Sequence, residues 1–296
     1  MKKQITAIFG IILFSLQLSA QQKKQSGAIQ FVTAVDPVAM AAANGIKLSD
    51  DMLARMPKAS KSEFELLFNA TNASYMPASE IEDSNGGGGG GGGAAAGAMR
   101  GFGGFGGMGA ANRDLYFNFL ENKLTEVFDM SDTTYFLQAK LGVSSNPVIN
   151  MGGMGPSKAP VTTITKTSET KKILGLNCNL VIFTTVSTRK IMNEDKEITD
   201  VVNVWYTTEL GFNFSPRPDL WTEGAVLSIE ARGSSTTAQS IEYRNVSNKD
   251  VNLPKKGVVI TADEYKAKME QRMKQMRNNR GNGNGNVIRV GGAGFQ

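Results

Sequence analysis

The chain has 296 residues and no histidine, and the lack of histidine excludes Ser-His-Asp and Cys-His catalysis, His-ligated zinc sites and histidine-based pH switching. Its single cysteine, Cys178, excludes a disulfide within the chain. The formal net charge is +5, and residues 261–296 carry seven Lys or Arg against three Asp or Glu, so the basic character gathers there and argues against a nucleic-acid-binding core.

The first 20 residues have the order of a secretory signal peptide. Lys2 and Lys3 form a positive start, residues 5–16 are an apolar run too short to span a bilayer, and Ala20 ends a cleavage region. We therefore predict a signal peptide over residues 1–20, cleaved near Ala20. No cysteine follows for lipid attachment and no later run reaches membrane length, so we expect an exported protein that is soluble or peripheral.

The region after the signal alternates short elements. Residues 27–35 predict a strand, and Ser49 with the two following aspartates caps a short helix that Pro57 ends. Residues 62–69 alternate apolar and polar side chains, which indicates a half-buried strand, and residues 73–76 can pair back to it.

A glycine-rich stretch interrupts this pattern. Residues 86–93 are all glycine, and Phe102 and Phe105 lie among further Gly, Ala and Met. Glycine loses the most backbone entropy on ordering, so we predict a disordered insertion over residues 83–112. Residues 101–106 match GxGxxG, but no strand precedes them, so no dinucleotide site is predicted. The two Phe side chains are candidate partner contacts, although a tolerated insertion is favoured.

Structure resumes at Asp114 as a series of segments rich in β-branched and aromatic residues. These segments are 115–119, 123–130, 134–140, 161–167, 171–174, 178–188, 201–208, 225–232 and 236–246, with residues 194–197 as a charged hairpin loop. We therefore predict that residues 21–260 form a mainly β domain, with one antiparallel, curved sheet or half-barrel of about ten strands.

The C-terminal part is predicted to be helical. Thr261 and Glu264 form a capping box, and Tyr265, Met269, Met273 and Met276 recur at helical spacing as one apolar stripe over residues 261–280. Two interpretations remain. The helix either lies on an anionic membrane face or a partner, or docks on the β domain with its charges in solvent; the thin stripe favours the second. Residues 281–296 read as a flexible Gly/Asn-rich tail.

Individual side chains indicate no catalytic, cofactor-binding or metal-binding set. Cys178 shares a strand face with Leu176 and Leu180, which favours a buried apolar role over a reactive thiol. Trp205, Tyr206 and Trp221 are candidate ligand or partner contacts, yet aromatics in strands more often pack in the core.

The order of several segments resembles the GLPGLI family of exported proteins from Bacteroidetes-type bacteria. The resembling segments are 64–69 with Tyr75, the Gly-rich insertion, 172–175 with Cys178, 204–207, and 255–257 with Ile260 and Thr261 before a Met- and Lys-rich helix. The segment that names the family should lie near residues 218–227, but it reads PDLWTEGAVL, and only Gly224 and the apolar residues after it correspond. Gly224 could supply a positive φ if this segment is a tight turn.

The resemblance implies a β-rich accessory protein of the bacterial envelope, located in the periplasm. Three functions remain open. The first is a non-catalytic binding module that holds an apolar ligand in a groove of the sheet, lined from residues 64–68 and 201–206. The second is a structural or interaction protein that docks to an outer-membrane partner. The third is an enzyme that uses paired carboxylates in a deep pocket, which we rank last because no pair stands out in the sequence.

Overall fold

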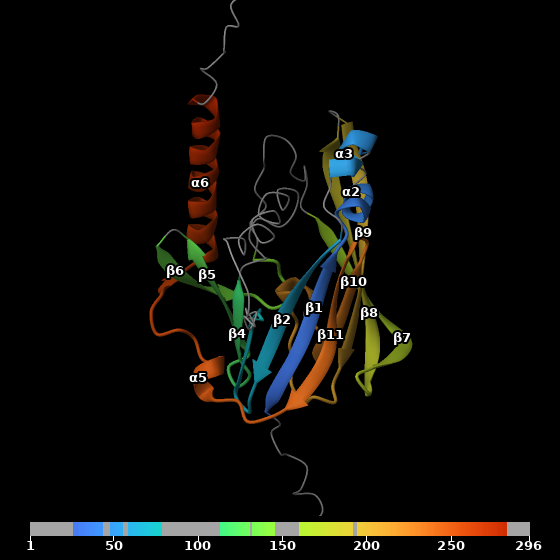
Figure 1. The fold of residues 1–296 in the computed structure, drawn as a ribbon, viewed down its shortest axis with the longest axis vertical. Coiled ribbons are helices and arrows are strands. Elements are labelled where there is room, and N and C mark those ends of the chain that lie inside the picture. The colour runs from blue at the N-terminus through green and yellow to red at the C-terminus, as the bar shows by residue number, and fades with distance from the viewer. Residues whose placement is uncertain are drawn as a thin grey trace, which may run out of the picture.

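The protein is described from a computed structural model that covers residues 26–43, 48–55, 59–78, 113–130, 132–145, 160–191 and 194–282 (Figure 1). The predicted signal peptide, the whole predicted insertion 83–112 with Phe102 and Phe105, and the tail after residue 282 lie outside the described residues.

One mixed sheet of 12 strands forms the body of the molecule, in the order β12-β6-β5-β4-β3-β2-β1-β11-β10-β9-β8-β7. The strands are β1 (Gly27–Val35), β2 (Ser60–Phe68), β3 (Asn72–Pro77), β4 (Asp114–Asn118), β5 (Lys123–Met130), β6 (Thr133–Ala139), β7 (Val161–Ile173), β8 (Leu176–Ile191), β9 (Glu194–Thr207), β10 (Ala225–Ala231), β11 (Ser234–Tyr243) and β12 (Val258–Ile260).

The expectation of about ten strands in an antiparallel sheet was wrong in two respects. The sheet has 12 strands, and β12 pairs in parallel with β6, Val258 opposite Tyr135 and Ile260 opposite Leu137. Three residues are too few to carry a period-2 pattern, and Val258 and Val259 are exposed, so only the docking of this segment beside β6 defines it as a strand.

The charged segment 194–197 was also assigned wrongly. It is the start of β9 and pairs with the end of β8, Glu197 opposite Thr188 and Glu194 opposite Ile191. The long β8–β9 hairpin therefore continues through residues 194–197, whose side chains are all exposed to solvent. Charged composition indicated exposure correctly, but exposure does not prevent backbone pairing.

Helices are few in the described residues. They are α2 (Pro37–Ala43), α3 (Asp50–Arg55), the one-turn helix η2 (Pro218–Leu220), α5 (Asn248–Val251) and α6 (Ala262–Asn282). The predicted short helix after Ser49 corresponds to α3, and the predicted C-terminal helix corresponds to α6. No helix in the described part of the chain combines the length and the apolar character that crossing a bilayer requires.

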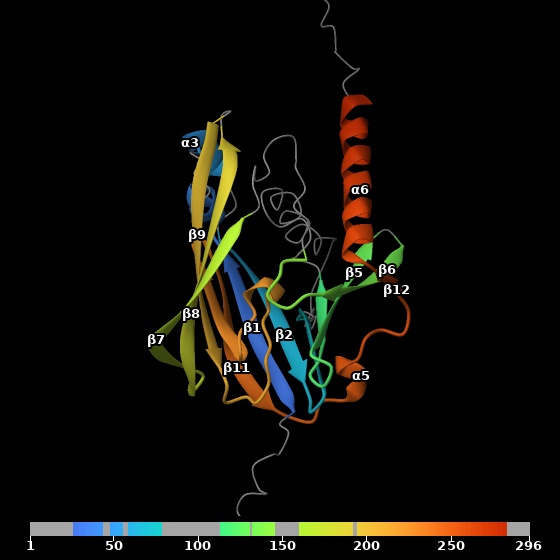
Figure 2. The same ribbon diagram turned by 180° about the vertical axis from the view of Figure 1, so that it is seen from behind.

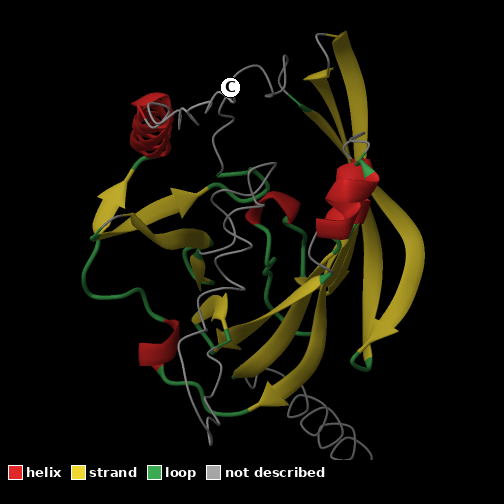
Figure 3. Ribbon diagram, turned by 45° about the horizontal axis from the view of Figure 1, so that its top comes forward, coloured by secondary structure: helices red, strands yellow, loops and turns green. Residues whose placement is uncertain are grey.

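The largest apolar cluster lies on the inner side of the curved sheet. It joins side chains of β1 to β6 and of β8 to β11 with those of the connection between β9 and β10, residues 208–224, which we call the inner segment. Figures 2 and 3 show the strands curving around this connection. A second cluster, from β8, β9 and β10, includes Val204 and Leu220, and a third joins Phe128 and Leu137 to α6.

Candidate functional site

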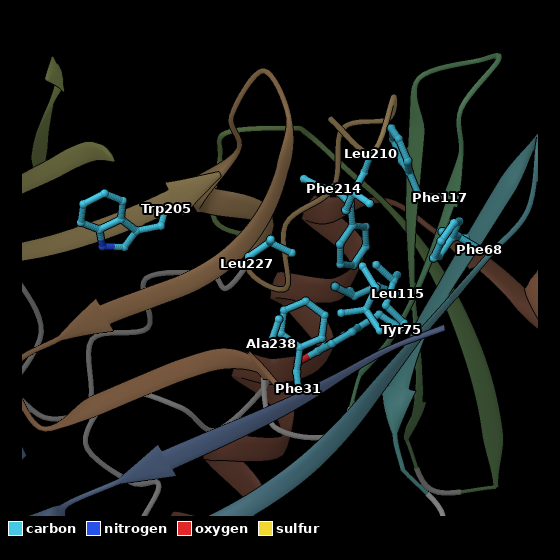
Figure 4. Close-up of a cluster of buried hydrophobic side chains, with 14 of the residues drawn as sticks. Phe31, Phe68, Tyr75, Leu115, Phe117, Trp205, Leu210, Phe214, Leu227 and Ala238 are labelled. Carbon is cyan, nitrogen blue, oxygen red and sulfur yellow. The ribbon is translucent and has the colours of Figure 1, made fainter. Parts of the chain in front are cut away.

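The inner segment fills the face of the sheet where a ligand groove was predicted. Phe212 packs against Phe68 with ring centroids 4.9 Å apart, and the ring centroids of Phe214 and Tyr75 are 5.7 Å apart. Phe214 is 1% exposed and pairs with Ala225 through an isolated parallel bridge. Figure 4 shows Phe214 and Leu210 among the side chains of Phe68, Tyr75, Leu115 and Phe117. The described residues therefore close this face with the protein's own side chains.

Trp221 and Gly224, two of the predicted contact residues, belong to this packing. Trp221 lies edge-on to Phe117, with ring centroids 4.9 Å apart. Gly224 does not have the positive φ that a tight turn would need. A glycine is required for another reason, because a Cβ there would lie 2.3 Å from the carbonyl oxygen of Thr207.

Trp205 and Tyr206 are neighbours in sequence but point to opposite faces of β9. Trp205 is 8% exposed, and the Lys171 ammonium lies 4.1 Å from its ring centroid. Tyr206 is buried, and its hydroxyl donates a hydrogen bond of 2.8 Å to Glu223. Burial and the nearby Glu223 carboxylate raise the pKa of Tyr206 to about 12. Figure 4 shows Trp205 apart from the aromatic side chains around Phe214, although Trp205 and Trp221 both belong to the packing of the main apolar cluster.

Cys178 is fully buried in the main apolar cluster, as expected from its strand face. Burial raises the pKa of its thiol, which disfavours the thiolate needed for nucleophilic chemistry.

The third apolar cluster carries the feature with the most functional interest, the attachment of α6. At the start of the helix the predicted capping box is present. The Thr261 backbone N–H donates to Glu264 at 2.8 Å, and the Glu264 backbone N–H donates to the Thr261 hydroxyl at 3.2 Å. The hydrogen bonds from the Thr261 backbone and side chain lower the pKa of the Glu264 carboxyl.

Behind the cap, a buried ionic group holds α6 to the sheet. Arg113 forms an ion pair with Glu126 and donates a hydrogen bond of 2.6 Å to the Tyr265 hydroxyl. Its guanidinium lies 5.0 Å from the ring centroid of Phe128 and 4.8 Å from that of Tyr265. We call Arg113, Glu126, Phe128 and Tyr265 the helix anchor. Burial lowers the pKa of Arg113, and the interaction with Tyr265 opposes this shift.

Sequence reasoning missed the anchor. Leu124, Glu126 and Phe128 share one face of β5 by strand alternation, so a carboxylate stands in the middle of an apolar face. Such a position needs a cationic partner, because an unpaired buried charge is very costly. The pattern therefore signals a buried ion pair, but it could not identify Arg113, which lies outside any predicted element.

Beyond the anchor, α6 leaves the sheet. Met269 packs against the third cluster and the Lys268 ammonium lies 5.2 Å from the Tyr135 ring centroid. From Glu270 to Gln275 every side chain is exposed except that of Met273, which is half-buried. Figures 1 and 2 show most of the helix extending past the ends of β5 and β6. The helix is therefore fixed at its N-terminal end and exposes most side chains of residues 270–275.

On the other side of β4 and β5, two carboxylates line a hollow of about 330 Å³. Asp114 and Asp129 share it with Thr134, which donates a hydrogen bond of 2.6 Å to Asp129, and with apolar walls that include Val127 and Pro254. Burial and the charge of Asp129 raise the pKa of Asp114. Two carboxyl groups in one hollow are the kind of pair that general acid–base chemistry uses. Among the described residues, no group of three or more acidic or Cys side chains could hold a metal ion.

The shifted pKa of Asp114 makes a pH-dependent prediction. Its pKa is higher in the folded protein than in the unfolded chain, so this group's stabilising effect is present at low pH and is lost as the pH rises through the folded-state pKa. Asp114→Asn should therefore raise the melting temperature at neutral pH, by a free energy of only about a few tenths of a kcal/mol because solvent reaches the hollow. The gain should vanish near about pH 3, below the ordinary aspartate pKa.

Thermal unfolding followed by circular dichroism at several pH values measures this effect, with the exposed Glu63→Gln as the matched control. A stabilisation by Asp114→Asn that does not change with pH would show that the carboxyl charge is not its cause.

A second hollow, of about 490 Å³, has no charged lining. It lies between the β7–β8 turn, Leu174 to Leu176, and the final residues of β11, including Ile241 and Tyr243. The β10–β11 ladder ends at Thr237 opposite Ser228, so the later residues of β11 pair only with β1. None of the predicted contact residues lines this hollow.

Comparison with known proteins gives no family. No family model matches the sequence, and no curated protein matches it. Two crystal forms of PNGF-II are similar in structure, with TM-scores of 0.44 and 0.41 and 15% sequence identity in both. They align over 82% and 83% of this chain but only 32% and 34% of the PNGF-II chain, so the protein spans about a third of that length. A likeness at this level carries no argument about function.

Proposed function

We propose that the protein is a non-catalytic accessory protein of the bacterial cell envelope that works by docking to an envelope partner through α6. The observation that carries this proposal is the one-sided attachment of the helix. Its first turns are held by a buried ion pair and an aromatic contact, whereas the side chains of residues 270–275 are all exposed except that of Met273, which is half-buried.

Helix stability supports a partner for those exposed turns. Most helices in proteins are stabilised by tertiary packing of an apolar face rather than by their intrinsic propensity. In α6 that packing is confined to Tyr265 and Met269 among the described side chains. The cap and the anchor hold α6 at one end and leave the side chains of residues 270–275 accessible, which suits contact with another surface.

The predicted signal peptide and the resemblance to the GLPGLI family support the proposal that this docking takes place in the periplasm. The filled inner face favours docking over carriage of an apolar ligand, because the inner segment occupies the groove that a carrier would need. The degenerate segment near residues 218–227 forms part of this filling, since Trp221 packs on Phe117.

The test is retention of the exported protein by the envelope. The protein is expressed with its export signal, the soluble periplasmic contents are released, and the fraction that stays with the membranes is measured. Neutralising three basic residues of α6, Lys266→Gln with Arg272→Gln and Arg277→Gln, should move most of the protein to the soluble fraction.

A matched control changes three exposed lysines elsewhere, Lys61→Gln, Lys140→Gln and Lys172→Gln. This control should keep the wild-type distribution. Equal release of both variants, or release of the wild-type protein itself, would contradict docking through α6.

A second candidate function, carboxylate-dependent catalysis, is favoured by the hollow that holds Asp114 and Asp129. Complementation of a deletion strain separates the two candidates. The docking proposal expects the α6 variant to fail and Asp114→Asn with Asp129→Asn to complement, whereas catalysis expects the reverse.

A further inference from the structure

The distribution of charge around α6 identifies what kind of partner it fits. At about 100° per residue, Met269 and Met273 fall on one stripe, with Lys266 on one side of it and Arg272 on the other. Lys266 and Arg272 are exposed and Met273 is half-buried. The sequence continues with Met276, Arg277 and Arg280. In the described turns, exposed cations therefore lie on both sides of the two methionines, and because the helix as a whole has little amphipathic character, charge is the property that distinguishes it.

From this arrangement we infer that α6 docks on an anionic lipid surface. This inference rests on the proposed function and names the partner that α6 would bind. The interaction joins the Lys and Arg side chains to the phosphate headgroups of the bilayer. Because Met269 packs on the third cluster, Met273 is the described methionine that can enter the boundary between headgroups and acyl chains.

The narrow stripe favours lipid over a protein groove. A helix that binds in a protein groove usually anchors through a continuous row of apolar residues at positions i, i+3, i+4 and i+7. Here Met269 already packs partly on the third cluster, so little apolar area is left to bury. Charge must then supply most of the binding free energy, and a bilayer offers many equivalent negative groups without requiring a shaped surface.

The position of α6 and the distribution of its charges are compatible with binding to a lipid surface. The anchor holds the N-terminal end of α6 on β5 and β6, and the later turns pass beyond these strands (Figures 1 and 2). Asp263 and Glu264 lie in the first turn beside the anchor, so the acidic residues gather where the helix meets the sheet and the basic ones predominate farther along. Binding should weaken steeply with salt, because exposed charges are screened beyond about 8 Å at physiological ionic strength.

The experiment measures binding of the exported, purified protein to two kinds of vesicle. One is phosphatidylcholine alone, and the other contains about one-third phosphatidylglycerol. Co-sedimentation should show binding to the anionic vesicles only. Each neutralised cation should reduce the partition coefficient about fivefold, so Lys266→Gln with Arg272→Gln and Arg277→Gln should reduce it roughly 100-fold.

The control triple, Lys61→Gln, Lys140→Gln and Lys172→Gln, should change the partition coefficient by no more than about twofold. Circular dichroism of each variant checks that it is folded, and Met273→Gln, which keeps every charge, should also weaken binding. Loss of binding in the control triple equal to that in the α6 triple would overturn the inference, because general basicity would then be the cause.

The vesicle experiment and the envelope-retention experiment can give different results. If retention in cells depends on α6 but the purified protein does not bind anionic vesicles, the partner is a protein. The lipid inference is then wrong, while docking through α6 stands. If retention does not depend on α6, the proposed function itself is wrong.

Discussion

Replacing Arg113 with methionine is expected to lower the free energy of unfolding by about 3 to 5 kcal/mol. Arg113 and Glu126 are both less than a tenth exposed, and removing the guanidinium leaves the Glu126 carboxylate buried without its cation. It also removes the hydrogen bond to Tyr265 and the guanidinium–ring contacts with Phe128 and Tyr265. Chemical denaturation monitored by circular dichroism gives the change directly.

The double substitution Arg113→Met with Glu126→Leu tests the cause. Replacing both charges with apolar groups avoids an unpaired buried ion, so the double variant should recover most of the stability that the single variant loses. Tyr265→Phe should cost only about 1 kcal/mol, because it removes one hydrogen bond and keeps the ring contact with Phe128. Equal losses in the single and double variants would mean that packing, and not charge pairing, holds the anchor together.

The second large effect concerns the inner segment. Phe214→Ala should lower the free energy of unfolding by about 3 to 5 kcal/mol, since the ring is 1% exposed and packs against Tyr75 and Trp221. The cavity would open on the inner face of the sheet, where the sequence had predicted a ligand groove. Denaturation curves of the variant and of Leu120→Ala, whose side chain is 73% exposed, provide the comparison.

The control Leu120→Ala should change stability by less than about 0.5 kcal/mol. A loss below about 1 kcal/mol for Phe214→Ala would show that the inner segment is not essential to the core, and a displaceable segment would revive the ligand-groove hypothesis.

The difference between predicted and observed strands has a simple physical origin. Long segments such as 123–130 and 201–208 could be predicted as strands because they are rich in β-branched and aromatic residues. The start of β9 and the three residues of β12 could not, because their side chains face solvent and only backbone pairing with a distant strand makes them part of the sheet. Their structure depends on neighbours that a local pattern does not contain.

At the candidate site, too, local features could be predicted from the sequence and contacts between distant residues could not. The capping box of α6 could be predicted because Thr261 and Glu264 are three residues apart and interact within one helical turn. The helix anchor could not, because Arg113 and Tyr265 are separated by 152 positions and meet only after β4, β5 and α6 have packed.

Composition and local spacing were enough to predict the β-rich class, the C-terminal helix with its cap, the burial of Cys178 and the exclusion of histidine chemistry. The tertiary structure was needed to show that the inner segment fills the curve of the sheet, that Trp205 and Trp221 join one apolar cluster, and that α6 is attached at one end. Those outcomes depend on contacts between residues far apart in the chain, and a hydrophobic pattern shows which side chains must be buried but not which partners will bury them.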